Sequence, residues 1–460
     1  WVYRNYTKES LNNMKTKFLH IATALLFVGF TSSCSDFLDR YPLDELSDSS
    51  FWKTENDAMM AVTDIYGCLP TWDQDEDINS DNAVHGIKWA AGNISKGVYD
   101  PMDQSWAGSY TPIRQCNLVL EKVKDIEMSD ESRKKIEGQA YFFRAFVYFN
   151  LIRSFGDVPY IDKPLNLTDV EDITRTPREE VYAKVMADFD KAIEYLPEEW
   201  DAANTPRVTK GAALAMKARA ALYYNNWQVA ADASKAVMDL GKYELYDAGN
   251  TGKYQELFWE KSDGCDENIL YVQFNYPDKT HYLIGWECFP TLGWGGMNPT
   301  QSLVDAFEDK DGAPISKSTI YNEKDPFKNR DPRLEVNVLH DGEEMYGVTI
   351  KVKPLKSSGK TGIEQHGDAT ATGYYQQKWL DPSIDPQSEG WNMGKDWVVI
   401  RYAEVLLTYA EAMNELHPLS AESFDAVNQV RRRVGIQTQA NRHIVLLKMN
   451  FVNVFKTNGV

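Results

Sequence analysis

Most of the chain between residues 50 and 245 carries apolar residues at the three- and four-residue spacing of amphipathic helices. Residues 176–197 show the pattern best. Thr176 is expected to be the N-cap, with Pro177 in the first helical position and Glu179 completing a capping box, and Pro197 ends the helix. The expected buried face consists of Val181, Val185, Phe189, Ala192 and Leu196.

Residues 129–160 predict a second long helix that stops at Gly156, because glycine is the usual residue just past a helix end. Its expected apolar side is Phe142, Phe146, Phe149 and Ile152.

Residues 209–242 predict a helix pair rather than a single helix. The segment spans about 34 residues, alternates alanine with aromatic residues and has a turn at "YNNW", which is typical of a tetratricopeptide unit. Residues 400–435 have the same texture. Because one helix pair cannot bury both of its faces, several pairs must stack. The fold class is therefore expected to be mainly α, an α-solenoid of tetratricopeptide-like helix pairs.

Residues 246–400 interrupt this helical pattern. They are rich in Gly, Pro, Asp and aromatic residues and contain short strand-like runs, "NILYVQF" and "WVVIRYA". We expect a loop-rich insertion on the helical scaffold, and such loops are where binding usually takes place. The expected organisation is a leader over 1–33, a helical domain over 34–245, a ligand-facing region over 246–400, a helix pair over 401–435 and an atypical tail over 436–460.

The amino-terminal segment predicts export and a lipid anchor. An apolar run of about 13 residues from Phe18 to Phe30 follows Lys15 and Lys17, which is the pattern of a signal peptide. The small residues before Cys34 resemble a bacterial lipobox, although Thr31 stands where Leu is usual. Cys34 is therefore the expected lipidation site. Ordinary secretory cleavage just before this cysteine is the alternative.

Charge and cysteine content narrow the function classes. A formal charge of -19 and a pI of about 4.9 argue against nucleic-acid binding and against docking on anionic lipid by charge alone. No segment after the leader reaches membrane-spanning length. The remaining cysteines form no CxxC pair and are expected to be free thiols, with one disulfide as the alternative: Cys68, Cys116, Cys265 and Cys288.

The sequence contains no motif of a known catalytic centre, and neither a metal nor a cofactor is expected. Residues 73–82 begin like a calcium loop, but Ile78 replaces the required glycine and Val84 the closing glutamate. A solvated acidic loop is the better interpretation.

Tryptophan supplies the candidate binding chemistry, since flat indoles stack on the apolar faces of sugar rings. Trp52, Trp106, Trp227 and Trp259 lie in regular patterns and are expected to pack structurally. Four others lie in irregular polar sequence, where local packing is the alternative to ligand contact. The candidate ligand-binding residues are Trp72, Trp89, Trp286 and Trp294, helped by Asn82 and Asn298.

The chain resembles the SusD/RagB-like outer-membrane nutrient-binding lipoproteins. The resemblance rests on "CSDFLDRYPLDELSDSSFW", "RSFGDVPY", "RVTKGAALAMKARAALYYNNW", "NRDPRLEVNVL" and "RYAEVLLTYAEA", in that order over residues 34–435. It implies four tetratricopeptide-like helix pairs and ligand contacts in the loops around residues 80–93 and 281–299. The segment after Gly435 departs from the family pattern and looks frameshifted or truncated.

The resemblance implies a non-enzymatic glycan-binding protein, lipid-anchored on the outer membrane and exposed at the cell surface. It would capture oligosaccharide for a SusC-like TonB-dependent transporter. A peptide-binding, RagB-like member of the same family is the first alternative, because it would share every scaffold motif. A glycoside hydrolase is the second, because a glycosidase requires only two suitably spaced carboxylates.

Overall fold

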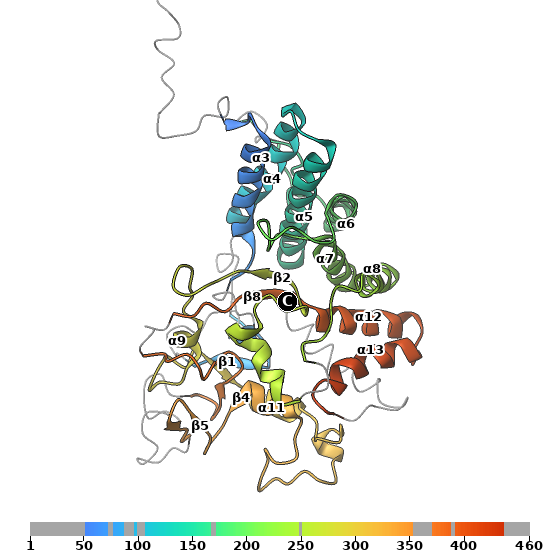
Figure 1. Cartoon of the computed structure of the whole chain (residues 1–460). Coiled ribbons are helices and arrows are strands. Elements are labelled where there is room, and N and C mark those ends of the chain that lie inside the picture. Colours follow the sequence, from blue (N-terminus) through green and yellow to red (C-terminus); the bar gives the residue numbers. More distant parts are fainter. Residues whose placement is uncertain are drawn as a thin grey trace, which may run out of the picture.

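Eight long helices form the frame in the part of the chain that the structure describes (Figure 1). The computed structural model describes residues 51–71, 77–86, 96–98, 106–166, 172–247, 251–352, 370–387 and 392–436, so Cys34, Trp72, Trp89 and the expected leader and tail lie outside it. The frame helices are α3 (Glu55–Ile65), α4 (Tyr110–Lys122), α5 (Asp130–Phe155), α6 (Arg178–Tyr195), α7 (Lys210–Tyr223), α8 (Trp227–Asp239), α12 (Tyr402–Leu416) and α13 (Ala421–Arg432).

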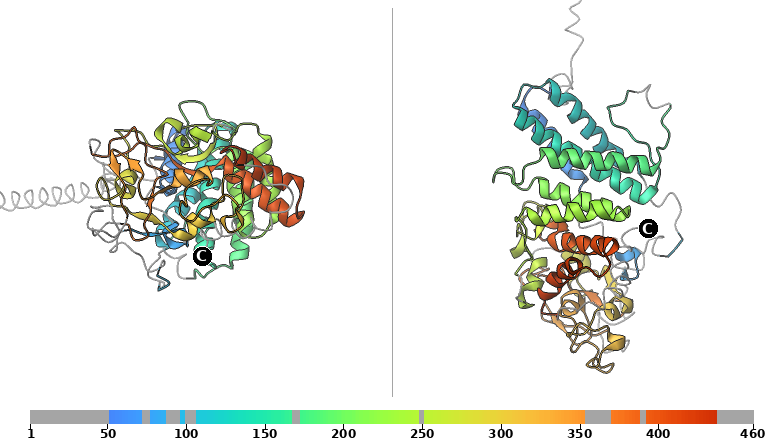
Figure 2. Two further views of the ribbon diagram at one scale, coloured as in Figure 1. Left: turned by 90° about the horizontal axis from the view of Figure 1, so that it is seen from below. Right: turned by 90° about the vertical axis from the view of Figure 1, so that its right-hand side faces the viewer.

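Each frame helix packs against the next one along the chain, and α12 packs directly on α8 although the loop-rich region separates them in sequence. Figure 2 shows the pairs as one stack that runs from α3 and α4 to α12 and α13. The expected tetratricopeptide-like scaffold is confirmed, and the two predicted helix pairs are α7–α8 and α12–α13. No helix of the described residues is both long enough and apolar enough to cross a membrane.

Helix α5 is buried on nearly all sides because it lies among α3, α4 and α6. The predicted aromatic face is buried, but so are Phe143 and Tyr148 on the other sides. Arg144 also points inward, where its guanidinium donates to Asp188 at 2.7 and 2.8 Å and to Asn117 at 2.8 Å. The helix ends at Gly156, whose φ of 69° suits glycine, as the sequence predicts.

The predicted start of α6 is wrong in its detail. Thr176 is not the N-cap; its backbone pairs with Val158 in a short bridge, and the proline after it takes the cap position. The first free N–H of the helix, on Arg178, donates instead to the Asp157 carboxylate at 3.0 Å. Glu179 accordingly completes no capping box and pairs with Arg178. A tertiary partner replaces the local cap that the sequence pattern predicts.

Short antiparallel sheets organise the loop-rich region between α8 and α12. The two predicted strand-like runs pair with each other as β2 (Asn268–Val272) and β8 (Trp397–Arg401). The other described pairs are β1 (Ala83–His85) with β3 (Met297–Pro299), β4 (Val338–Leu339) with β7 (Tyr375–Gln376), and β5 (Glu344–Met345) with β6 (Val348–Thr349). Short helices α9 (Leu283–Glu287), α10 (Gln301–Ala306) and α11 (Pro332–Asn337) lie between them.

A fully buried carboxylate, Glu267, connects this region to the frame. It pairs with Arg401 at 2.5 Å and with Arg433 at 2.6 Å, and it accepts the Tyr246 N–H at 2.7 Å. Burial raises the pKa of Glu267, but the guanidiniums of Arg401 and Arg433 outweigh burial and hold that pKa below its usual value. One side chain thereby joins the chain after α8, the strand before α12 and the end of α13.

We expect Glu267→Gln to lower the free energy of unfolding by about 3–5 kcal/mol, because it leaves the buried Arg433 without its anion. Because the pKa is lowered in the folded state, the difference between wild type and variant should be constant at neutral pH. It should shrink as the pH falls below about 4, where the carboxylate takes up a proton. Urea unfolding at several pH values measures both effects.

The matched control is Glu194→Gln, which breaks an exposed pair with Lys191 and should cost less than about 1 kcal/mol. Equal unfolding midpoints for Glu267→Gln and wild type at pH 7 would contradict the role given to Glu267.

Candidate ligand-binding site

Exposed aromatic side chains gather in one part of the loop-rich region. Seven large hydrophobic side chains of the described residues are at least 36% exposed, and the three aromatic ones all fall between residues 276 and 294. They are Tyr276 at 48%, Tyr282 at 55% and Trp294 at 36%. Exposed aromatic side chains within one short stretch of the chain make that stretch a candidate interaction site.

Strand pairing brings the two loops singled out from the sequence together. Val84 of β1 lies opposite Asn298 of β3, and the pairing continues on both sides. The Gly86 N–H donates to the Gly296 carbonyl at 2.9 Å, beyond one end of the strands. In Figure 1, β1 and α9 accordingly lie together in the loop-rich region. Strand pairing therefore places parts of residues 80–86 and 281–299 side by side.

Trp286 and Trp294 form a stacked pair in the second of these segments. Their ring centroids are 6.3 Å apart and the ring planes differ by 21°. Trp286 is half-buried, and its indole lies against Gly296: a Cβ on that residue would stand 2.4 Å from the indole nitrogen. A side chain at position 296 would displace the ring, so the pair depends on this glycine.

The loop that carries Trp294 folds back on α9 through backbone hydrogen bonds. The N–H groups of Trp294, Gly295 and Gly296 donate to the carbonyls of Gly285, Cys288 and Trp286 at 3.0, 2.7 and 2.7 Å respectively. The N–H of Trp286 donates in turn to the Tyr282 carbonyl at 2.9 Å. These backbone hydrogen bonds fix the positions of the two residues that carry the indoles.

The two candidate asparagines have different environments. Asn298 has no exposed surface; its side chain donates to the Gly295 carbonyl at 3.2 Å and accepts the Ala371 N–H at 2.8 Å. Asn82 is half-buried at the start of β1, and its amide donates to Asp77 at 3.4 Å. Of these two asparagines, only Asn82 has exposed surface that a ligand could contact. Asn298 instead stabilises the loop that carries Trp294 through its hydrogen bond to Gly295.

Sequence reasoning missed Tyr282. It lies four residues before Trp286, one helical turn away, and it is more exposed than either indole of the pair. The four-residue spacing was visible, but α9 is only five residues long and gives no periodic signal.

Three of the four tryptophans expected to be structural pack against hydrophobic cores. Trp52 and Trp106 pack against the main hydrophobic core and Trp259 against a smaller one. Trp106 also stacks with Arg175, whose guanidinium lies 4.7 Å from the ring centroid. Trp227 is half-buried at the start of α8.

The possible metal ligands and nucleophiles in the described part of the chain are its carboxylates, cysteines and histidines. They contain no group of three or more His, Cys, Asp or Glu side chains that could hold a metal ion. Burial raises the pKa of all four described cysteines, so their thiols stay protonated at neutral pH. Burial also lowers the pKa of His281 to about 4. The four cysteines are free, as the first of the two sequence interpretations predicts: Cys68, Cys116, Cys265 and Cys288.

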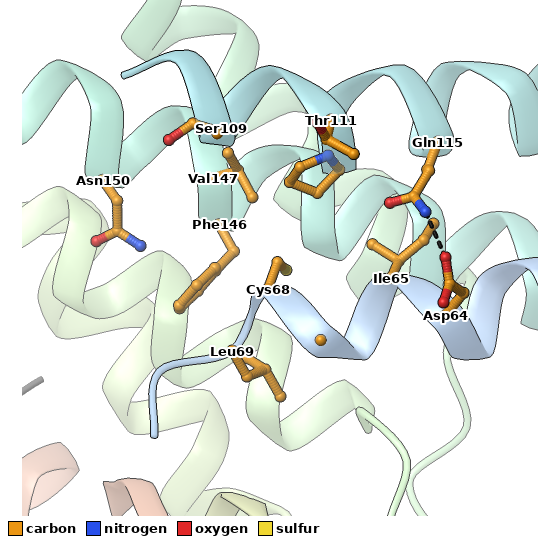
Figure 3. Close-up of a pocket in the computed structure, with 13 residues that line it drawn as sticks. Asp64, Ile65, Cys68, Leu69, Ser109, Thr111, Gln115, Phe146, Val147 and Asn150 are labelled. Carbon is orange, nitrogen blue, oxygen red and sulfur yellow. Dashed lines mark hydrogen bonds between the residues drawn. The ribbon is translucent and has the colours of Figure 1, made fainter. Parts of the chain in front are cut away.

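A cavity of about 410 Å³ lies elsewhere, in the helical frame among α3, α4 and α5 (Figure 3). Cys68 and Phe146 line its middle, and at one end Gln115 donates to Asp64. Burial raises the pKa of Cys68 to about 12, so the cavity offers no thiolate nucleophile. None of the described residues predicted to bind ligand lines it.

Comparison with known families matches both halves of the chain to SusD proteins. A model described as "Starch-binding associating with outer membrane" matches residues 38–222, and the SusD family model matches residues 258–444. The chain belongs to the SusD/RagB family. SusD-family proteins are binding proteins rather than enzymes, which agrees with the sequence analysis.

Individual SusD-like relatives agree over nearly the whole chain. A SusD-like protein of Formosa agariphila is 25% identical over 443 residues, covering 92% of this chain and 82% of the relative. A solved SusD-like protein from Bacteroides fragilis is 27% identical with a TM-score of 0.78, over 91% of this chain and 86% of that one. A second B. fragilis structure, a SusD-like carbohydrate-binding protein, is 25% identical with a TM-score of 0.75, over 89% and 85% of the two chains.

Proposed function

We propose that this protein is a surface glycan-binding protein of the outer membrane that captures an oligosaccharide and delivers it to a SusC-like TonB-dependent transporter. The observation that carries the proposal is the stacked pair formed by the half-buried Trp286 and the exposed Trp294. Membership of the SusD family and the likeness to a carbohydrate-binding protein of B. fragilis support a carbohydrate as the ligand.

The chemistry of the surface suits a sugar. A pyranose ring has apolar C–H faces bordered by hydroxyl groups, so it stacks on an indole while its rim forms hydrogen bonds. Trp286 and Trp294 supply the flat apolar area in the proposal. The exposed Tyr282, at the start of α9, and the half-buried Asn82, just before β1, are the proposed polar partners. The proposal also includes Trp89 and Trp72, which lie outside the described residues.

Glycan binding is expected to be weak, with a Kd between about 1 μM and 1 mM. Trp286→Ala and Trp294→Ala should each weaken it about five-fold, because one stacked ring contributes about 1 kcal/mol. Trp89→Ala should act in the same direction. Calorimetry against a panel of polysaccharides and peptides measures these affinities, and the peptides test the RagB-like alternative.

Trp227→Ala, on the helical frame, is the matched control and should leave affinity unchanged. Unchanged affinity and melting temperature in all three platform variants would place the glycan elsewhere. A lower melting temperature with unchanged affinity would instead assign the indoles to packing.

We further propose that Cys34 is acylated and anchors the protein to the outer membrane. The family match begins at residue 38, immediately after this cysteine, and a net charge of -19 gives no electrostatic attraction to anionic lipid. Mass spectrometry of the membrane-extracted protein should find acyl chains on Cys34, and Cys34→Ala should release the protein into the soluble fraction. Equal membrane retention of wild type and variant would contradict the anchor.

The proposed delivery step requires a transporter as partner, which the family resemblance implies. Purification from the native outer membrane in mild detergent should recover a large β-barrel protein together with this chain. Recovery of the chain alone, after growth on each glycan that it binds, would contradict the pairing with a transporter.

A further inference from the structure

Glu287 is a buried carboxylate beside the aromatic pair, and nothing in the proposed ligand contact uses it. It ends α9 and is 1% exposed. Its Oε2 accepts the Met297 N–H at 3.0 Å. With the Gln376 amide oriented to satisfy its neighbours, the same oxygen accepts the Gln376 N–H at 3.2 Å, and the Gln376 carbonyl accepts the Trp379 N–H at 2.9 Å.

The position of Glu287 in the loop is specific. Trp286, just before it, accepts the Gly296 N–H with its backbone carbonyl, and Glu287 accepts the next N–H, that of Met297, with its side chain. The loop that carries Trp294 is thus fixed to α9 at the point where it enters β3. Through Gln376, the same carboxylate also fixes β7, which packs beside β3.

We propose that Glu287 is a positioning residue that sets the stacked arrangement of Trp286 and Trp294, and thereby the affinity for glycan, without touching the ligand. The effect on affinity rests on the proposed function, whereas the effect on the indole pair does not.

The physical reason is the cost of a buried donor without an acceptor. If position 287 were apolar, the Met297 N–H and the Gln376 amide would both lose their partner inside the protein. The loop would have to shift to find water or another acceptor, and such a shift would carry Trp294 away from Trp286. An uncharged acceptor of the same shape would keep both bonds.

Glu287→Leu and Glu287→Gln separate these possibilities. Two indoles whose centroids lie 6.3 Å apart couple their excited states, and when their transition dipoles are skewed the pair gives an exciton couplet in circular dichroism. The difference between wild type and Trp294→Phe isolates the couplet of this pair. We expect Glu287→Gln to retain the couplet and to keep glycan affinity within about two-fold. Glu287→Leu should lose most of the couplet and bind glycan about five- to ten-fold more weakly, since the rings are no longer pre-positioned.

Three controls make the signal specific. Trp397→Phe removes the other stacked tryptophan pair among the described residues, which Trp397 forms with Trp379 at a centroid distance of 5.4 Å, so the couplet of that pair can be subtracted. Ile136→Ala, in the core of the helical frame, should lower the melting temperature and leave couplet and affinity unchanged. Gly296→Ala should disturb the couplet with Glu287 intact, because its Cβ would overlap the Trp286 ring.

The outcomes are distinct. An unchanged couplet in Glu287→Leu, with only a lower melting temperature, overturns the proposal, as does a Glu287→Gln variant as impaired as Glu287→Leu. If Glu287→Leu does not fold, Gln376→Met, which removes one of the two donors, replaces it in the test. A weaker couplet in Gln376→Met supports the proposal and an unchanged couplet overturns it.

If no glycan binds the wild type, the proposed function fails, while the couplet still decides the role of Glu287.

Discussion

The buried ion cluster at Glu267 is the constraint on which the remaining architecture depends. Helices α8 and α12 pack directly on each other, so the long loop-rich region between them must leave the frame and return to nearly the same place. The pairing of β2 with β8 provides that closure, and Glu267 fixes it to Arg401 and Arg433. A buried carboxylate is costly unless fully paired, and here two guanidiniums and a backbone N–H surround it.

This closure has a consequence for the candidate site. The β2–β8 pair and Glu267 fix both ends of the loop-rich region to the helical frame. In that region of the fold, the pairing of β1 with β3 joins a segment near residue 84 to one near residue 298. The loop that carries Trp294 is further fixed by backbone hydrogen bonds to α9 and to the residue after it. A surface that is ordered before the ligand arrives does not lose conformational freedom on binding, so weak individual contacts still give measurable affinity.

The helical frame could be predicted from the sequence because its signals are local. Alanine-rich helix pairs and a glycine after α5 specify their structures within a few residues, and the structure confirms them. The start of α6 could not be predicted in the same way. Its cap comes from Asp157, which lies just after the end of α5 and 21 residues before Arg178, and a local capping pattern at Thr176 concealed it.

The candidate site could be predicted only in part, for a similar reason. Irregular sequence around Trp286 and Trp294 indicated that no regular core requires these indoles, and the structure places both toward the surface. A polar residue can contact ligand only if it is exposed, and it supports the loop if it is buried. In helices and strands the sequence period indicates which side chains are buried, but in irregular segments there is no such pattern. Asn298 and Glu287 are both buried here, whereas Tyr282 is exposed on a helix too short to show a pattern.

The geometry of the indole pair also bears on what the surface can do for its ligand. Two rings that stack on each other at 6.3 Å leave no gap wide enough to enclose a sugar between them, so the sugar must lie across an open face. An open face buries little area and leaves much of the ligand in water, which limits the binding free energy and favours rapid dissociation. In the proposed function the protein passes its ligand to a transporter, and a rigid but shallow platform would meet both requirements of that role. Rigidity would secure capture at low affinity, and shallowness would permit release without a conformational change.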